Sequence, residues 1–240
     1  MSLVVAIDGP AASGKSTVAK ELAKRLGLVH IDTGAMYRAI TYLVLKKGLD
    51  PENEEESCSV LGDVNLELTI DGKVFINGDD VTKIIREADV TNNVSYIASY
   101  KKIRLHLVEL QRKMSKNLSV VMDGRDIGTY VLPHADVKIF QIASVEARAQ
   151  RRYEENIAKG DKCELKEIED VIRKRDYIDS HRDFAPLTQA EDSVILDTSN
   201  LTIKEAVKAC EKIIKDKLLK DGKKDLLRQE IFIKELGDVE

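Results

Sequence analysis

The stretch AIDGPAASGKSTVAKELAKRL, residues 6–26, sets the fold of this chain. It begins as a short apolar run, passes through a glycine-rich turn that ends in Gly14-Lys15-Ser16, and continues with apolar residues at helical spacing. Residues 9–16 match G-x-x-x-x-G-K-[ST] at every fixed position, and the motif lies between a predicted strand and a predicted helix, as its mechanism requires. The stretch therefore predicts a loop that holds phosphate.

The residues of this loop suit the triphosphate of ATP with Mg²⁺. Backbone N–H groups of such a loop and the positive end of the helix dipole both point at the anion. We expect Lys15 to reach the β- and γ-phosphates and the Ser16 hydroxyl to ligate Mg²⁺. The residues expected to contact ATP are Gly9, Pro10, Ala11, Ala12, Ser13, Gly14, Lys15, Ser16 and Thr17.

A phosphate loop alone does not choose among switches, motors and kinases. The chain has no Asn-Lys-x-Asp sequence to read guanine, and 240 residues are few for a motor or remodelling ATPase. Transfer of phosphate to a small acceptor remains. This interpretation predicts a second anion site.

Composition indicates an ordinary soluble globular protein, with 33% charged residues, 43% hydrophobic residues and a net charge of -4. The chain lacks a global basic field for nucleic acid, an apolar run long enough to cross a bilayer, and a signal-like N-terminus. We expect a cytoplasmic monomer that binds neither nucleic acid nor membrane. The spacing of Cys58, Cys163 and Cys210 favours neither zinc nor disulfides, and Cys210 is expected to be a buried thiol.

Five short apolar runs separated by helical stretches predict a three-layer α/β fold with a five-stranded parallel sheet. The runs are residues 3–8, 28–31, 118–123, 137–142 and 194–197. Two segments interrupt the alternation. LELTIDGKVFINGDDV, residues 66–81, alternates around Asp71-Gly72 and predicts an inserted β-hairpin, and residues 144–183 hold a concentration of arginines.

Two further stretches follow strands at the sheet edge where open α/β folds bind ligands: IDTGAMYRAI (31–40) and VVMDGRDIGT (120–129). Together with IDGPAASGKST (7–17) and RKRDYIDSHRDFAPL (173–187), they stand in the order found in bacterial cytidylate kinases. The chain resembles the long form of this nucleoside monophosphate kinase family over about residues 3–220, including the hairpin. The four motifs together carry the resemblance.

The resemblance implies a P-loop NTPase-type fold of the adenylate kinase kind, forming one domain over residues 1–220. Its core would span about residues 1–36, 100–147 and 184–220, with a monophosphate-binding insert at about 37–99 and a helical lid at about 148–183. Residues 221–240 form an extension whose role the resemblance does not explain. The implied reaction is ATP plus CMP giving ADP plus CDP, with dCMP as a second acceptor.

The resemblance also implies roles for individual residues beyond the phosphate loop. Three match positions that read cytosine, namely Ser95, Arg104 and Asp126. Three match positions near the acceptor phosphate, namely Thr33, Arg38 and Arg125. Three match lid positions that contact sugar and phosphates, namely Arg175, Asp179 and Arg182, with the division between the two arginines left open.

The mechanism implied by these matches depends on positive charge. The residues expected to act in catalysis are Lys15, Arg125, Arg175 and Arg182. Arg152 is expected at the ATP phosphates, whereas Arg148 and Arg151 are expected on a solvated helix face outside the site. No dedicated base is required, because a phosphate acceptor is already anionic.

Two alternatives remain open at this point. One is another small-acceptor P-loop kinase, acting on UMP, dTMP or a hydroxylated metabolite, which acceptor choice would distinguish. The other is an ATP-dependent binding or regulatory module, which would turn over ATP without a phosphorylated small product.

Overall fold

The computed structural model describes residues 2–160 and 162–227. Its main sheet has five parallel strands in the order β2-β6-β1-β7-β8. The strands are β1 Val4–Asp8, β2 Val29–Asp32, β6 Val120–Gly124, β7 Val137–Ile142 and β8 Val194–Asp197. The predicted five-stranded parallel sheet is confirmed.

Helices cover both faces of this sheet. On one face, α1 Lys15–Leu26 and α8 Ile203–Lys220 pack against Val5 and Ile7. On the other face, α5 Lys101–Ser115 and the short helix η3 Ile127–Val131 pack against Ala6 and Met122. Consecutive residues of β1 thus alternate between two cores, as the period of a strand requires. Cys210 is fully buried in the first core, as expected.

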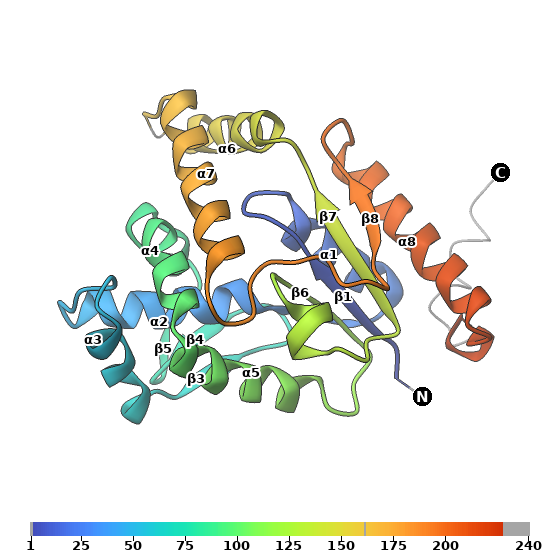
Figure 1. Ribbon diagram of the computed structural model, residues 1–240, viewed down its shortest axis with the longest axis horizontal. Helices are drawn as coiled ribbons and strands as arrows, with labels where there is room; N and C mark the ends of the chain where they lie inside the picture. Colours follow the sequence, from blue (N-terminus) through green and yellow to red (C-terminus); the bar gives the residue numbers. More distant parts are fainter. Residues whose placement is uncertain (1, 161, 228–240) are drawn as a thin grey trace.

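The segment between β2 and β6 builds a separate core around α2 Thr33–Lys46. Figure 1 shows α2, α3 and α4 gathered at the opposite end of the molecule from α8. The other elements of this segment are α3 Glu54–Ser59, η1 Val60–Asp63, β3 Leu66–Leu68, β4 Val74–Ile76, β5 Asp79–Asp80, η2 Ile84–Arg86 and α4 Ala88–Ser99.

The predicted hairpin is present as β3 and β4. The segment also adds a third strand, so that it forms a three-stranded antiparallel sheet in the order β3-β4-β5. Gly72, with φ 85, makes the first turn. Asn77 and Gly78 have φ 51 and 87 and make a second turn that adds β5. An Asn-Gly pair is a strong hairpin signal, so the sequence contained this turn and our interpretation missed it.

The arginine-rich segment forms two helices, α6 Val145–Lys159 and α7 Leu165–His181, which pack through Ala149, Ile168 and Ile172. In Figure 1, α7 lies beside α4 and near the loop that precedes α1. The last described element is η4 Lys224–Leu227, and the remainder of the predicted extension lies outside the described residues. No helix of the described residues combines the length and hydropathy needed to cross a membrane.

Candidate active site

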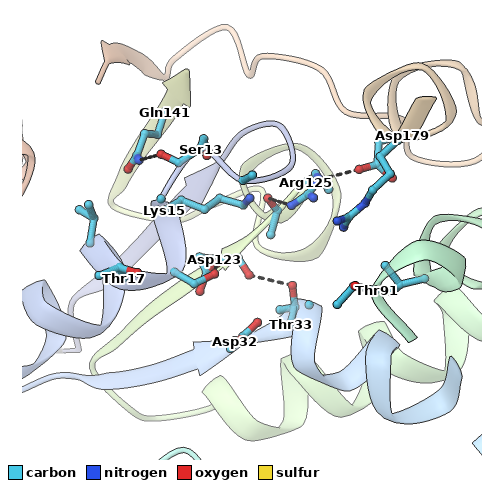
Figure 2. A pocket seen from close by; sticks show the side chains of 18 of the residues that line it. Ser13, Lys15, Thr17, Asp32, Thr33, Thr91, Asp123, Arg125, Gln141 and Asp179 are labelled. Atoms are coloured by element: carbon cyan, nitrogen blue, oxygen red, sulfur yellow. Dashed lines mark hydrogen bonds and ion pairs between the residues drawn. The ribbon is translucent and has the colours of Figure 1, made fainter. Parts of the chain in front are cut away.

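A cavity of about 610 Å³ lies at the carboxyl ends of the strands, between the phosphate loop and α4. Figure 2 shows Gln141 and Ser13 on one side of this cavity and Asp179 and Thr91 on the other. The predicted site residues that line it are Ala12, Ser13, Gly14, Lys15, Ser16, Thr17, Thr33, Arg38, Ser95, Arg104, Arg125, Asp126, Arg152, Arg175, Asp179 and Arg182. Gly9, Pro10 and Ala11 belong to the loop but do not line the cavity.

The phosphate loop is shaped by close backbone packing. A Cβ on Gly9 would lie 2.0 Å from the carbonyl oxygen of Gln141, so only glycine fits there. The Gln141 side chain donates from Nε2 to the Ser13 carbonyl at 2.7 Å. Gly14, at φ 82, is the residue before α1, and no side chain caps that helix. The free N–H groups at the start of α1 therefore remain available for an anion.

Lys15 is buried beside this loop, where Nζ donates to the Pro10 carbonyl at 3.0 Å. Burial, reinforced by the nearby Arg125, lowers the pKa of Lys15 to about 7. Arg175 experiences a similar environment: burial and Arg125 lower its pKa to about 10. Burial disfavours the charged form of both groups, the neighbouring cations add to this effect, and a bound anion would oppose it.

A pair of oxygen ligands lies next to the loop. Ser16 Oγ donates to Asp123 Oδ2 at 2.6 Å, and the other carboxylate oxygen lies 2.7 Å from His30 Nε2. Mg²⁺ is commonly held by one or two such oxygens with substrate phosphates and water, so this donor set fits that ion. We had expected Ser16 alone. Asp123 could have been predicted from the sequence, because it ends the apolar run of residues 118–123, and phosphate-loop proteins use an aspartate of this kind to hold Mg²⁺.

The far end of the cavity holds a buried ion pair. Arg104, 1% exposed, donates to Asp126 at 2.5 Å and to the Ala98 carbonyl at 3.0 Å. The guanidinium carbon lies 5.4 Å from the centre of the Tyr37 ring, which our sequence interpretation missed. Ser95 Oγ is buried without a hydrogen-bond partner among the described residues. These polar atoms lie in the cavity wall, where a planar ligand with donors and acceptors would complete their bonding.

Three further arginines surround the middle of the cavity. Arg125 Nε donates to Asp179 at 2.8 Å, and Arg38 donates to Asp32 at 3.0 Å. Burial opposes ionisation of Asp32, but Arg38 and Arg86 together lower its pKa to about 2. Arg175 Nε is buried and has no partner among the described residues.

Thr33 is held at the start of α2, where its hydroxyl donates to the Asp123 carbonyl at 2.8 Å. Asp32, the residue before it, caps the same helix by accepting from the Ala35 N–H at 2.9 Å. The sequence DTG therefore both begins the helix and directs polar groups into the cavity.

The arginines of α6 and α7 do not all lie where we expected them from the sequence. Arg182 lies 3.4 Å from Asp126 and donates to the Ala185 carbonyl, which places it beside the Arg104 pair. Arg151 lines the cavity although we expected it outside. Arg148 does not line it, but it is 4% exposed and not on a solvated face, because its guanidinium binds backbone carbonyls and Asp176.

Asp8 joins the two halves of the site. It ends β1, and its two carboxylate oxygens accept from the N–H groups of Ile127 and Gly128, each at 2.7 Å. Burial raises the pKa of Asp8 to about 7, against the opposing effect of these two hydrogen bonds. The strand that carries the phosphate loop is thereby fixed to the turn that carries Arg125 and Asp126.

Comparison with known proteins agrees with this geometry. The family model described as Cytidylate kinase matches residues 5–216. The cytidylate kinase of Anoxybacillus flavithermus is 54% identical over 206 residues, 85% of this chain and 92% of that protein. That of Oceanobacillus iheyensis is 51% identical over 222 residues, covering 91% and 93% of the two chains.

Among solved structures, an uncharacterized protein from Eubacterium ventriosum superposes with a TM-score of 0.51 at 14% identity, over 90% of this chain and 99% of that one. This likeness concerns the fold alone. The family match and the identities over most of the chain confirm the resemblance carried by the four motifs: the chain belongs to the cytidylate kinase family of phosphotransferases, whose acceptor is a phosphate group.

Proposed function

We propose that this enzyme transfers the γ-phosphate of ATP to CMP, giving ADP and CDP, with dCMP as a second acceptor. The observation that carries the proposal is the single cavity that joins the phosphate loop to the buried Arg104–Asp126 pair. Its two ends would hold donor and acceptor with their phosphates between them.

The donor end would bind ATP through the loop backbone, with Lys15 on the β- and γ-phosphates and Arg152 at the rim. Arg152 is half-buried, which suits a side chain that closes on a ligand from outside. Ser16 and Asp123 would hold Mg²⁺. When bound, the ion neutralises charge on the phosphate oxygens.

The acceptor end would read cytosine by its hydrogen-bonding edge. Asp126 would accept from the exocyclic amine, while Arg104 and Ser95 would address the carbonyl and the ring nitrogen. Uracil has a carbonyl oxygen in place of the amine and would face the carboxylate with another acceptor. Sites that hydrogen-bond a substrate group discriminate strongly against an analogue that lacks it.

The reacting phosphates would lie among Thr33, Arg38, Arg125 and Arg175, with Asp179 at the ribose hydroxyls. An oxygen of the CMP phosphate forms the new bond to the γ-phosphorus as the bond to the β–γ bridging oxygen breaks. The acceptor oxygen is already anionic, so positioning and positive charge contribute most of the rate. Arg182 lies beside Asp126 and would link the base to the closing helix.

We propose the domain division stated above for this chain, with α6 and α7 as a lid that excludes water and residues 37–99 as the monophosphate-binding insert. The proposal includes a monomeric enzyme acting in the cytoplasm on free nucleotides. The contacts of α7 with α4 and, through Asp176, with Ala11 of the phosphate loop support a closing role.

The test is incubation with Mg²⁺ and ATP and, separately, CMP, dCMP, UMP, AMP, dTMP or shikimate, following both ADP and the phosphorylated product. We expect CDP and dCDP well ahead of every other product. ATP turnover without a phosphorylated small product, or a faster reaction with another acceptor, would contradict the proposal.

A further inference from the structure

Ala11 lies at the apex of the phosphate loop, and both of its backbone polar groups are hydrogen-bonded to side chains of α6 and α7. The Ala11 N–H donates to Asp176 Oδ1 at 3.1 Å, and its carbonyl accepts from Arg148 Nη1 at 2.9 Å. The same nitrogen of Arg148 donates to Asp176 Oδ2 at 2.6 Å. We call these three residues the apex clamp.

The apex clamp is anchored to the sheet. Besides its clamp contacts, Arg148 donates from Nε to the Ala143 carbonyl at 2.9 Å and the Ser144 carbonyl at 3.3 Å, at the junction of β7 and α6. One buried guanidinium thus connects the end of β7, the loop apex and α7. Asp176 is 23% exposed, but Arg148 is buried, so removing the Asp176 carboxylate would leave a buried positive charge without its partner.

A second ion pair joins the same two helices without touching the loop. Arg173 of α7 lies 3.3 Å from Glu146 of α6, and these side chains are 55% and 69% exposed. An exposed pair of this kind contributes little to stability. It therefore provides a matched control, because it removes a contact between α6 and α7 and leaves the apex clamp intact.

The clamp residue Asp176 lies next to the side chains of α7 that line the cavity. Asp176 directly follows Arg175, whose buried Nε has no partner among the described residues. Asp179, almost one turn further along α7, is bound to Arg125. Because Asp176 is bonded to Ala11 of the loop, a shift of α7 relative to the loop would move the neighbouring Arg175 as well. Small displacements matter, because a misplacement of about 1 Å can cost about 10²-fold in rate.

We propose that Arg148 and Asp176 are positioning residues that lock α7 to the apex of the phosphate loop and so direct the γ-phosphoryl group to CMP rather than to water. This inference rests on the proposed function. In the competing reaction an oxygen of water bonds to the γ-phosphorus, the bond to the β–γ bridging oxygen breaks, and ADP, inorganic phosphate and a proton are released. A loosely held α7 admits that water.

The test compares Asp176→Asn with Arg173→Gln in the full chain. Asparagine keeps the size of aspartate, but its amide group cannot accept from Arg148 and Ala11 together. We expect Asp176→Asn to lower kcat for CDP formation by about tenfold, to change KM for CMP by less than about threefold, and to raise the ADP formed in excess of CDP. Arg173→Gln stays within about twofold of the parent enzyme on all three measures.

Arg148→Lys provides a second variant, since it keeps the charge but loses the planar fork of donors. We expect the same excess of ADP over CDP. Thermal unfolding of each variant identifies loss of fold, which lowers both products together and leaves their ratio unchanged. An Asp176→Asn enzyme that matches Arg173→Gln in kcat and in product ratio would overturn the clamp.

Hydrogen exchange of the ligand-free variants separates this inference from the proposed function. We expect faster exchange in peptides covering residues 9–14 in Asp176→Asn but not in Arg173→Gln. If the parent enzyme forms no CDP, the proposed function fails and this measurement alone decides whether the clamp holds the loop. Equal exchange in the two variants would overturn it.

Discussion

The two ends of the cavity differ in the chemical groups that line them. The donor end is mostly backbone: a loop closed against Gln141 and the uncapped start of α1. The acceptor side consists of charged side chains already paired with one another: Arg104 with Asp126 at the far end, and Arg125 with Asp179 nearer the middle of the cavity. The backbone donors face an anion site directly, whereas the acceptor charges must change partners when a ligand enters.

This difference separates general phosphate binding from selection of the substrate. Backbone N–H groups bind polyphosphates without reading the rest of the ligand, so we expect the donor end to contribute affinity and rate. Buried charges with unmet hydrogen bonds penalise a ligand that fails to complete them, so we expect the acceptor end to contribute selectivity. Variants at the two ends are therefore expected to fail in different ways.

The largest effect is expected for Lys15→Met at the donor end. It removes the buried charge expected to stabilise the transferring phosphoryl group, and losses of about 10²–10³-fold in kcat are typical for such a contact. Steady-state kinetics with CMP and dCMP should show an equal loss for both acceptors. Lys20, exposed on the same helix, is the control, and a comparable loss in Lys20→Met would contradict the assignment.

Arg182→Ala should have a smaller effect, centred on the acceptor side. Arg182 contacts Asp126 and the Ala185 carbonyl, so its loss disturbs α7 and the base end together. We expect kcat to fall by about 10–10²-fold while ATP binding, measured by calorimetry, weakens less than about threefold. Unchanged turnover would remove Arg182 from the mechanism.

A subtler effect concerns the proton on Lys15. Its pKa is lowered to about 7 by burial and Arg125, so the ammonium group is mostly deprotonated at pH 8 in the ligand-free enzyme. Bound triphosphate raises that pKa, and up to about one proton should be taken up per ATP at pH 8. Calorimetry in buffers of different ionisation enthalpy measures the uptake, which should vanish in Lys15→Met. Equal uptake in both proteins would refute it.

A separate effect concerns the stability of the fold rather than catalysis, and it involves Asp8. Burial raises its pKa from 3.8 to about 7, so between these values the folded chain binds more protons than the unfolded chain. The Asp8 contribution to stability is therefore full below pH 4 and is lost as the pH rises through 7, with a slope of at most about 1.4 kcal/mol per pH unit. Urea unfolding from pH 4 to 7 should show that Asp8→Asn lacks this contribution. Parallel pH curves for the two proteins would contradict it.

The local features of this molecule could be predicted from its sequence. The phosphate loop, the five strands and the helix start at Asp32 each depend on residues close together in the chain, where spacing and turn chemistry act directly. The second turn of the small sheet, Asn77-Gly78, carried an equally local signal that we overlooked.

The partnerships across the site could not be derived from spacing. Arg104 and Asp126 are separated by 22 positions, and Arg125 and Asp179 by 54. Hydrophobic periodicity describes only residues close together in the sequence, so it predicts neither pair. Their positions were available only through family resemblance, which names residues but not partners. The burial of Arg148 was missed for the same reason. The sequence of its helix is highly charged, which is typical of a solvent-exposed helix, and only the tertiary fold places Ala11 in contact with Arg148.

The most direct test of the central claim is a competition between equal concentrations of CMP and UMP, followed by quantifying CDP and UDP in the same reaction. The parent enzyme is expected to prefer CMP by at least about 10²-fold, and Asp126→Asn to reduce that ratio by about 10–10²-fold, because its amide can donate to the uracil carbonyl. Because both products come from one reaction, loss of stability in the variant does not affect their ratio. A parent enzyme indifferent to the base, or a variant that keeps the full preference for CMP, would contradict the account.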